Sequence, residues 1–170
     1  MAGQDLIYRQ RIHTNATVNG SPFLFVDDDA IGSAAATPNA TMTTHTIPAL
    51  GFDTLTMKFK SVFKSWGGKG YIEVWRPVNG IFGWHRIDSI KVDEGVGAAA
   101  TGWAAVTKTY NVTAYQSNDF KARFIYDDRN ANGVNLWAGY WAIDDFELNG
   151  ALSPPPATSN VTFNVDMNQV

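Results

Sequence analysis

Acidic side chains gather in three short segments of this chain: an aspartate triplet at 27–29, an aspartate pair at 144–145, and the run DRNANG at 128–133. Adjacent carboxylates repel one another unless a cation lies among them. Aspartate side chains and loop carbonyls are the hard oxygen donors that calcium takes, about six to eight at a time. Calcium binding is therefore the first chemistry to weigh for each segment.

The triplet consists of Asp27, Asp28 and Asp29. In a strand, Phe23, Phe25 and Asp27 would share one face, so Asp27 continues an apolar row. The alternative interpretation is a solvated, Asp-rich turn. From these residues alone, the turn and the metal site are equally favoured.

The pair lies inside the strongly apolar segment 136–148. With the strand period of two, Asp144 shares a face with Phe146 and Leu148, whereas Asp145 lies on the opposite face. We therefore expect Asp144 to point into the core and Asp145 to point outward. A carboxylate on a core face needs a hydrogen bond, an ion pair or a metal ion, so Asp144 is a candidate metal ligand.

The third segment matches the first half of a D-x-N-x-N-G calcium loop, with Asp128, Asn130 and Asn132 as side-chain donors and Gly133 at the turn. The match ends there, because Gly139 stands where such a loop would carry a bidentate Glu. Asp and Asn also favour tight turns without a metal. A turn is the favoured interpretation, and a second metal site is the alternative.

Composition excludes several functional classes. The chain has 170 residues, no Cys, a net charge of -3 and 45% hydrophobic residues. The lack of Cys excludes disulfides, iron-sulfur clusters and a thiol nucleophile, and the scatter of the three His argues against zinc or copper. Lys and Arg are scattered rather than clustered, so we expect no nucleic-acid partner. No apolar run reaches the roughly 18 residues of a membrane span, so we expect no membrane insertion.

Alternating apolar and polar residues indicate the elements that must position these groups. The clearest strands are residues 54–63 and 120–126, whose apolar residues share one face. Weaker strands are predicted at 5–12, 22–27, 41–47, 70–76, 85–92, 104–112 and 140–149. No segment has a convincing helical period. The predicted fold is all-β, an antiparallel β-sandwich with a jelly roll of the concanavalin-like or galactose-binding-like type as the leading topology.

The composition changes after Gly150, where three consecutive prolines begin at 154. We therefore expect a β-sandwich module over residues 1–150 and a stiff, Pro-rich linker over 151–160. Residues 161–170 begin with the alternating VTFNV and predict a short strand or the start of a following domain.

Three blocks of sequence carry a family resemblance: FLFVDDDAIG at 23–32, KGYIEVW at 69–75, and RFIYDDRNANGVNLWAGYWAIDDFEL at 123–148. Together they resemble the MAM-like, cleaved-adhesin or "choice-of-anchor" jelly-roll modules of secreted Bacteroidetes-type proteins. The resemblance covers roughly residues 5–149 and is strongest in the last block. It implies a cell-surface or extracellular location. The tail at 161–170, VTFNVDMNQV, resembles the opening strand of another module common in such proteins, which implies a larger multidomain parent exported by the type IX route.

The same resemblance implies a structural calcium ion shared by the opening Asp cluster and the last strand. Carried over, it assigns Asp27, Asp29 and Asp144 as ligands, with Asp28 less firmly placed. The first and last strands of the sandwich would then lie side by side. The DRNANG loop is longer and more polar than is usual in the family, which leaves the second site open.

The segment 143–147, IDDFE, invites comparison with jelly-roll glycosidases, in which carboxylates alternate on one strand face. The pattern fails here, because Ala142 and Phe146 stand where the nucleophile and the acid would be if Asp144 is the middle member. No G-x-S-x-G motif is present either. We expect a non-catalytic module, and a hydrolase is the least favoured of the alternatives.

Binding is the remaining function. The chain has 6 Trp and 6 Tyr, more aromatic rings than one sandwich core needs, and exposed rings are how sugar-binding modules stack pyranoses. The candidate ligand-binding aromatics are Trp66, Trp84, Trp137 and Tyr140. Core packing is favoured for any single ring, and Trp75 and Trp141 are interpreted as structural. We expect a glycan or an extracellular protein as ligand; the alternative is a passive spacer or accessory domain beside a secreted protease or polysaccharide hydrolase.

Overall fold

A computed structural model of the chain describes residues 24–27, 39–65, 67–78, 81–96, 104–129 and 139–152. In these ranges the chain forms eight strands and one short 3-10 helix. The strands are β1 (Leu24–Asp27), β2 (Asn39–Thr43), β3 (Thr54–Lys64), β4 (Lys69–Val78), β5 (Ile81–Ile90), β6 (Val106–Asn111), β7 (Lys121–Asp127) and β8 (Tyr140–Ala151). The 3-10 helix η1 (Thr113–Tyr115) follows β6.

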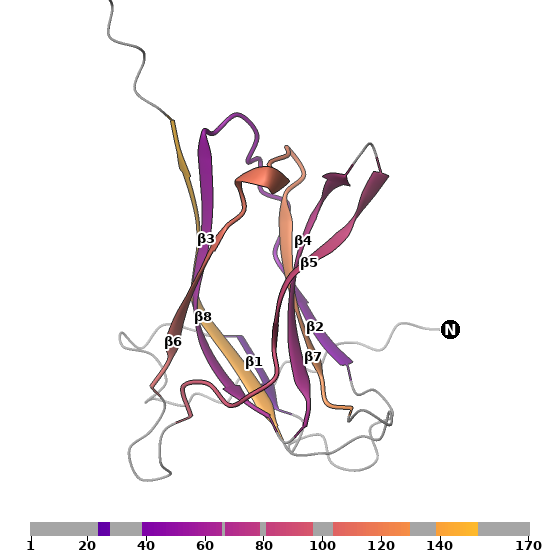
Figure 1. Cartoon of the computed structure of the whole chain (residues 1–170), viewed down its shortest axis with the longest axis vertical. Coiled ribbons are helices and arrows are strands. Elements are labelled where there is room, and N and C mark those ends of the chain that lie inside the picture. The colour runs from indigo at the N-terminus through magenta and orange to yellow at the C-terminus, as the bar shows by residue number, and fades with distance from the viewer. Residues whose placement is uncertain are drawn as a thin grey trace, which may run out of the picture.

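The strands form two four-stranded sheets that pack face to face (Figure 1). One sheet has the order β1-β8-β3-β6, and the other has the order β2-β7-β4-β5. Every neighbouring pair is antiparallel. The predicted antiparallel β-sandwich is therefore confirmed. The expectation that the first and last strands lie side by side is also confirmed for the described residues, since β1 pairs with β8.

The strands confirm the alternation seen in the sequence. Eight of the nine predicted segments contain a strand, and the remaining segment, 5–12, lies outside the described residues. β5 begins at Ile81, four residues before the predicted start, because Ile81 still pairs with Val78 across the β4–β5 connection. The helix η1 is a single 3-10 turn, too short to give a helical period.

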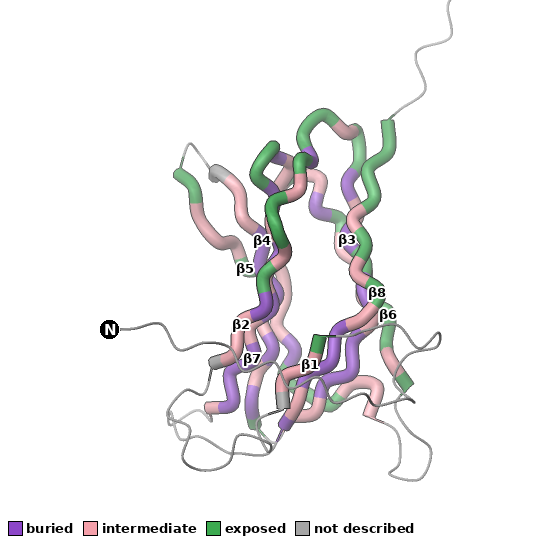
Figure 2. Tube along the Cα trace, turned by 180° about the vertical axis from the view of Figure 1, so that it is seen from behind, coloured by how far each residue is buried: buried purple, intermediate pink, exposed green. Residues whose placement is uncertain are grey.

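The core lies between the sheets, where the buried segments of the tube face one another (Figure 2). The predicted apolar faces of β3 and β7 are buried, with Phe59 and Phe63 fully inaccessible. Trp141 is confirmed as structural: it is 0% exposed, packs edge-on against Phe63 and Phe124, and donates a 3.0 Å hydrogen bond from its indole nitrogen to Ser61 Oγ. The paired hydroxyl makes a buried polar residue tolerable in β3.

A bulge interrupts the alternation of β8. Lys60 is opposite Asp144 and Lys58 is opposite Glu147, so β8 has one residue more than β3 between these pairs. Asp145 accommodates the bulge with a φ of 50°. This is the left-handed region, which Asp tolerates better than most residues. Trp141 and Ile143 face the core before the bulge, and Phe146 and Leu148 pack against it after the bulge.

The bulge corrects the orientation predicted for Asp144. Because Trp141 and Ile143 belong to the core, Asp144 lies on the opposite, outer face of the sheet, across from Lys60. The strict period of two assigned Asp144 to the same face as Phe146, which holds only without the extra residue. The expectation that Asp144 points into the core is therefore wrong.

The last strand continues to Ala151, one residue past the predicted end of the module. The predicted linker from 153 onward and the predicted strand within 161–170 lie outside the described residues. In the described part of the chain, no helix has the length and apolarity needed to cross a membrane.

Candidate functional site

The register of β1 on β8 decides which acidic residues can meet. Asp27 lies opposite Tyr140, and Leu24 lies opposite Ile143. Asp144 is therefore four residues from the position opposite Asp27, about 14 Å along the strand. Oxygens that bind one calcium ion lie within about 5 Å of each other, so the register is inconsistent with the expectation that Asp27 and Asp144 share an ion. Asp28 and Asp29 lie outside the described residues.

Asp128 lies at the end of the sandwich where β1 ends. It follows β7, is 0% exposed, and its Oδ1 is 3.5 Å from the hydroxyl of Tyr126. Two glycines allow this close packing, because a Cβ at Gly139 would overlap the Tyr126 hydroxyl and a Cβ at Gly68 would lie 3.2 Å from the Asp128 Cα. The sequence placed Asp128 in a turn or a second metal site, and the structure shows a buried carboxylate.

The backbone brings Asp27 to this same end. Gly139 packs under the Tyr126 hydroxyl, and the next residue, Tyr140, is the partner of Asp27. Asp27 and Asp128, which the sequence analysis treated as separate candidates, therefore lie at the same end of the sandwich, whereas Asp144 lies farther along β8. Asn130 and Asn132 lie outside the described residues. Among the residues that the structure does describe, no group of three or more His, Asp or Glu is placed to hold a metal.

The other carboxylates of β8 form ion pairs on the outer face of the first sheet. Asp145 Oδ2 lies 2.6 Å from Lys60 Nζ, and Glu147 Oε2 lies 3.7 Å from Lys58 Nζ. The hydrogen bond from Lys60 to Asp145 raises the pKa of the Lys60 ammonium. These partners explain charged residues on an otherwise apolar strand and give Asp145 the outward orientation that the sequence predicted.

Of the four predicted ligand-binding aromatic residues, the structure describes two. Trp66 and Trp137 lie outside the described residues. Tyr140 is half-buried, with its ring 5.9 Å from that of Phe25. Trp84 is half-buried on β5 and packs edge-on against Trp75 of β4 at 5.4 Å.

Trp84 belongs to a larger array on the outer face of the second sheet, which we call the Glu73 face. Alternation on three neighbouring strands directs its members away from the core. They are Lys121 and Arg123 of β7, Tyr71, Glu73 and Trp75 of β4, and Phe82, Trp84 and Arg86 of β5. The cross-strand pairs Glu73–Arg86, Glu73–Arg123 and Trp75–Trp84 bring these side chains together.

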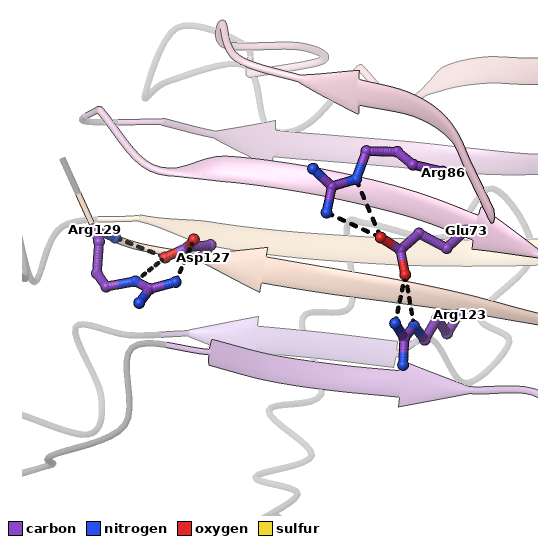
Figure 3. Close-up of polar contacts among 5 residues, drawn as sticks. All are labelled: Glu73, Arg86, Arg123, Asp127 and Arg129. Atoms are coloured by element: carbon purple, nitrogen blue, oxygen red, sulfur yellow. Dashed lines mark hydrogen bonds and ion pairs between the residues drawn. The ribbon is translucent and has the colours of Figure 1, made fainter. Parts of the chain in front are cut away.

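Glu73 is the centre of this face, and Figure 3 shows it held between two arginines. Its Oε1 accepts hydrogen bonds from Nε and Nη2 of Arg86 at 3.1 and 2.9 Å, and its Oε2 accepts from Nε of Arg123 at 2.8 Å. The Glu73 side chain is 7% exposed, whereas the Arg86 side chain is 50% exposed. Charge-assisted, forked hydrogen bonds of this kind fix both guanidinium groups in position.

The guanidinium groups also contact the aromatic rings. The Arg86 guanidinium lies 3.6 Å from the centre of the Tyr71 ring, and that of Arg123 lies 4.2 Å from the Trp84 ring. These distances are within the range of cation–π attraction. Each arginine is therefore fixed on one side by Glu73 and on the other by a ring.

Phe82, at the hairpin end of this face, is 57% exposed; its neighbour Ile81, 73% exposed, lies on the opposite side of β5. The Phe82 ring lies 6.3 Å from the Trp75 ring, so the aromatic surface continues from Trp84 and Trp75 to the end of β5. At the other end of the face, Arg129 pairs with Asp127 (Figure 3). Its hydrogen bonds hold the pKa of the Asp127 carboxyl below the usual value.

A hydrogen bond between the sheets fixes β5, the outermost described strand of its sheet. The Tyr110 hydroxyl of β6 donates to Asp88 Oδ2 of β5 at 2.6 Å. Burial and this carboxylate both raise the pKa of Tyr110, so the phenol remains protonated and keeps its donor. This contact holds β5 against the first sheet and thereby fixes the strand that carries Trp84 and Arg86.

The Glu73 face was missed from the sequence, apart from Trp84. The signal was present in KGYIEVW, where Tyr71, Glu73 and Trp75 alternate with apolar residues. Outward aromatic residues beside a carboxylate are unusual on a merely solvated face. Their partners could not be identified, because Arg123 is fifty positions from Glu73 and pairs with it only through the strand order.

No protein-family model matches the chain, and no curated protein sequence matches it.

Proposed function

We propose that this chain is a non-catalytic, ligand-binding module of a secreted or cell-surface protein, and that the Glu73 face is its ligand-binding surface. The ligand is a glycan or an extracellular protein. One observation carries the proposal: arginines and aromatic rings are fixed in an array around a buried carboxylate on a sheet face turned away from the core.

Rigidity is what makes this array suited to binding. A surface whose side chains are already ordered loses little conformational entropy when a ligand binds. Tyr, Trp and Arg are also the residues that contribute most to binding at protein surfaces. Arg86, half exposed beyond its ion pair, retains donors for a ligand, and Phe82 adds an exposed apolar ring.

The non-catalytic part of the proposal is supported by the partners of the carboxylates. Asp145 and Glu147 are paired with lysines, and Glu73 is paired with two arginines. Oxygens held in these ion pairs are not poised for the proton transfer to a substrate that a general acid or base must make. The glycosidase arrangement of two facing carboxyl groups, one protonated, has no counterpart among these residues.

We further propose that the topology is a jelly roll. Consecutive strands lie in opposite sheets at every connection except β4–β5, and two interleaved Greek keys give such an alternation. This supports the resemblance to cleaved-adhesin modules, and with it the extracellular location and the larger parent chain.

Calcium is proposed as a structural ion at the end of the sandwich that carries Asp27 and Asp128. Asp128 supports the proposal because its carboxyl is fully buried at this end of the sandwich, beside the hydroxyl of Tyr126. Oxygen donors from these residues fit a hard cation such as calcium. Asp144 has no part in this site, given its distance along β8.

A passive spacer is the second candidate, and one observation favours it. The cations of the Glu73 face already lie over two of its rings, Tyr71 and Trp84, so those ring faces are not free to stack on a sugar. A spacer would use the same array for stability alone.

A binding screen separates the two candidates. The whole chain is applied to immobilised glycans and matrix proteins, beside the double variant Phe82→Ala, Lys121→Gln on the Glu73 face. The matched control is Leu50→Ala, Lys58→Gln, which removes an exposed apolar residue and an exposed lysine elsewhere. A ligand-binding module binds at least one target, loses it in the first variant and keeps it in the control. A chain that binds nothing is a spacer.

A chelator tests the calcium proposal separately. A ligand bound only by the folded state stabilises it by RT ln(1 + [L]/Kd), so removing calcium should lower the melting temperature by several degrees. Asp128→Asn should abolish the difference between calcium and chelator, whereas Asp144→Asn should retain it. An unchanged melting temperature in the wild type, with no calcium found by elemental analysis, would remove calcium from the proposal.

A further inference from the structure

A second group of polar side chains lies on the inner side of the β4–β5 hairpin. Trp75 and Trp84 belong to the Glu73 face, so the next residues, Arg76 and His85, face the other way. There η1 lies between the two sheets (Figure 1). The Tyr115 ring of η1 lies near both side chains: its centre is 5.2 Å from the Arg76 guanidinium and 6.2 Å from the centre of the His85 ring.

Both side chains have a buried nitrogen without a hydrogen-bond partner. In the described part of the chain, Arg76 Nε and His85 Nε2 are inaccessible and meet no acceptor or donor. Ser117 Oγ, two residues after Tyr115, is buried without a partner as well. Buried polar atoms in native proteins are nearly always satisfied, and a guanidinium remains charged at any physiological pH. These atoms therefore call for an acceptor that comes from outside the described residues.

Space for such a group exists beside Gly83. Gly83 is the cross-strand partner of Arg76, and an ideal Cβ built on it has only His85 Nε2 within reach, at 4.0 Å. No side chain at position 83 fills the space next to His85 Nε2. A single Cβ would fit there without a clash, so the glycine leaves room beside His85 that packing does not use.

We propose that Arg76 and His85 bind a carboxylate. A guanidinium presents paired N–H donors that match the two oxygens of a carboxylate, and an N–H at imidazole Nε2 would add a further donor. The Tyr115 ring holds the guanidinium in place by cation–π attraction. One arginine balances the single charge of a carboxylate, whereas a doubly charged phosphate would call for a second cation.

This site is independent of the Glu73 face, since its residues point to the opposite side of the hairpin. The carboxylate could belong to a small free acid or to an acidic sugar. Both present a carboxylate to Arg76. They differ in the rest of the molecule, which would make further contacts around the site.

The experiment is an NMR titration of the whole 15N-labelled chain with sodium acetate, against sodium chloride at equal ionic strength. Acetate should move the Arg76 Nε–H and His85 ring signals along a saturable curve, with a Kd on the order of millimolar for so small a ligand. Chloride should not. A parallel titration with sodium galacturonate distinguishes the sources: tighter binding than acetate assigns an acidic sugar, and equal or weaker binding assigns a small free acid.

Two variants make the assignment specific. Arg76→Gln should weaken acetate binding at least tenfold, and Arg129→Gln, which alters an arginine paired with Asp127, should leave it unchanged. If Arg76→Gln disturbs the fold, Arg76→Lys keeps the charge but loses the paired donors and should weaken binding about fivefold. Signals of Arg76 and His85 that respond equally to acetate and chloride, or full affinity in the Arg76 variants, would overturn the proposal.

Discussion

The outer faces of the two sheets both carry ion pairs, but they bury their carboxylates to different degrees. On the first sheet, Glu147 is 50% exposed and lies 3.7 Å from Lys58. On the second sheet, Glu73 is 7% exposed, and its carboxylate oxygens accept hydrogen bonds of 3.1 Å or less from two arginines. Exposed pairs contribute little to stability, whereas a buried carboxylate depends on its partners. The comparison indicates that only the second face is built as a fixed array.

Removing the central carboxylate should have the largest effect. Glu73→Gln leaves two guanidinium groups without their shared acceptor, and we expect it to lower the free energy of unfolding by about 3 kcal/mol. The matched change on the other sheet, Glu147→Gln, should alter it by less than about 0.5 kcal/mol. Urea denaturation of both variants measures the difference. Equal losses would show that the two faces are energetically alike.

The bulge on the first sheet should give an intermediate effect. Asp145 has a φ of 50°, which a β-branched residue adopts only with strain. Asp145→Val should therefore lower the free energy of unfolding by about 1–2 kcal/mol. Asp145→Asn tolerates the same backbone and loses only the exposed pair with Lys60, so we expect a change below about 0.5 kcal/mol. If both variants lose the same amount, the ion pair and not the bulge determines this part of β8.

The smallest effect should be the pH dependence of the Asp127–Arg129 pair at the edge of the Glu73 face. The hydrogen bonds from Arg129 lower the folded-state pKa of Asp127, so the pair stabilises the fold above the unfolded pKa of about 3.9. That contribution, below about 1 kcal/mol for a partly exposed pair, is lost as the pH falls through the lowered pKa.

Arg129→Gln should remove this part of the pH dependence. The measurement is the free energy of unfolding of wild type and variant between pH 6 and about pH 2. The two curves should converge at the acid end and differ above pH 4. Parallel curves over the whole range would mean that Asp127 does not depend on Arg129.

The sequence predicted the fold well because strand periodicity is a local property. The alternating faces of β3 and β7 are buried as predicted, with Phe59 and Phe124 in the core. The prediction for Asp144 was wrong, because the bulge at Asp145 depends on a left-handed backbone that alternation does not reveal. Asp tolerates that conformation, but its presence alone does not predict one.

The site was less predictable than the fold. Alternation places Glu73 and Trp75 on one face, but Arg86 and Arg123 reach them only through the order β7-β4-β5. The expectation that Asp27 and Asp144 share a calcium ion shows the same limit of prediction from sequence. Adjacent strands were expected and found, yet the register of β1 on β8 separates the two residues. Pairing of distant segments, and not residue type, determines which groups meet.

The most direct test of the Glu73 face is an NMR titration with the tightest binder from the screen, followed through the indole N–H signals of the tryptophans. Trp141 is the internal reference, since it is buried in the core and bonded to Ser61. A ligand bound at the Glu73 face should shift the indole signals of Trp75 and Trp84 in a saturable way and leave that of Trp141 unchanged. Shifts confined to the strand residues around Lys58 and Lys60, with Trp75 and Trp84 unaffected, would contradict it.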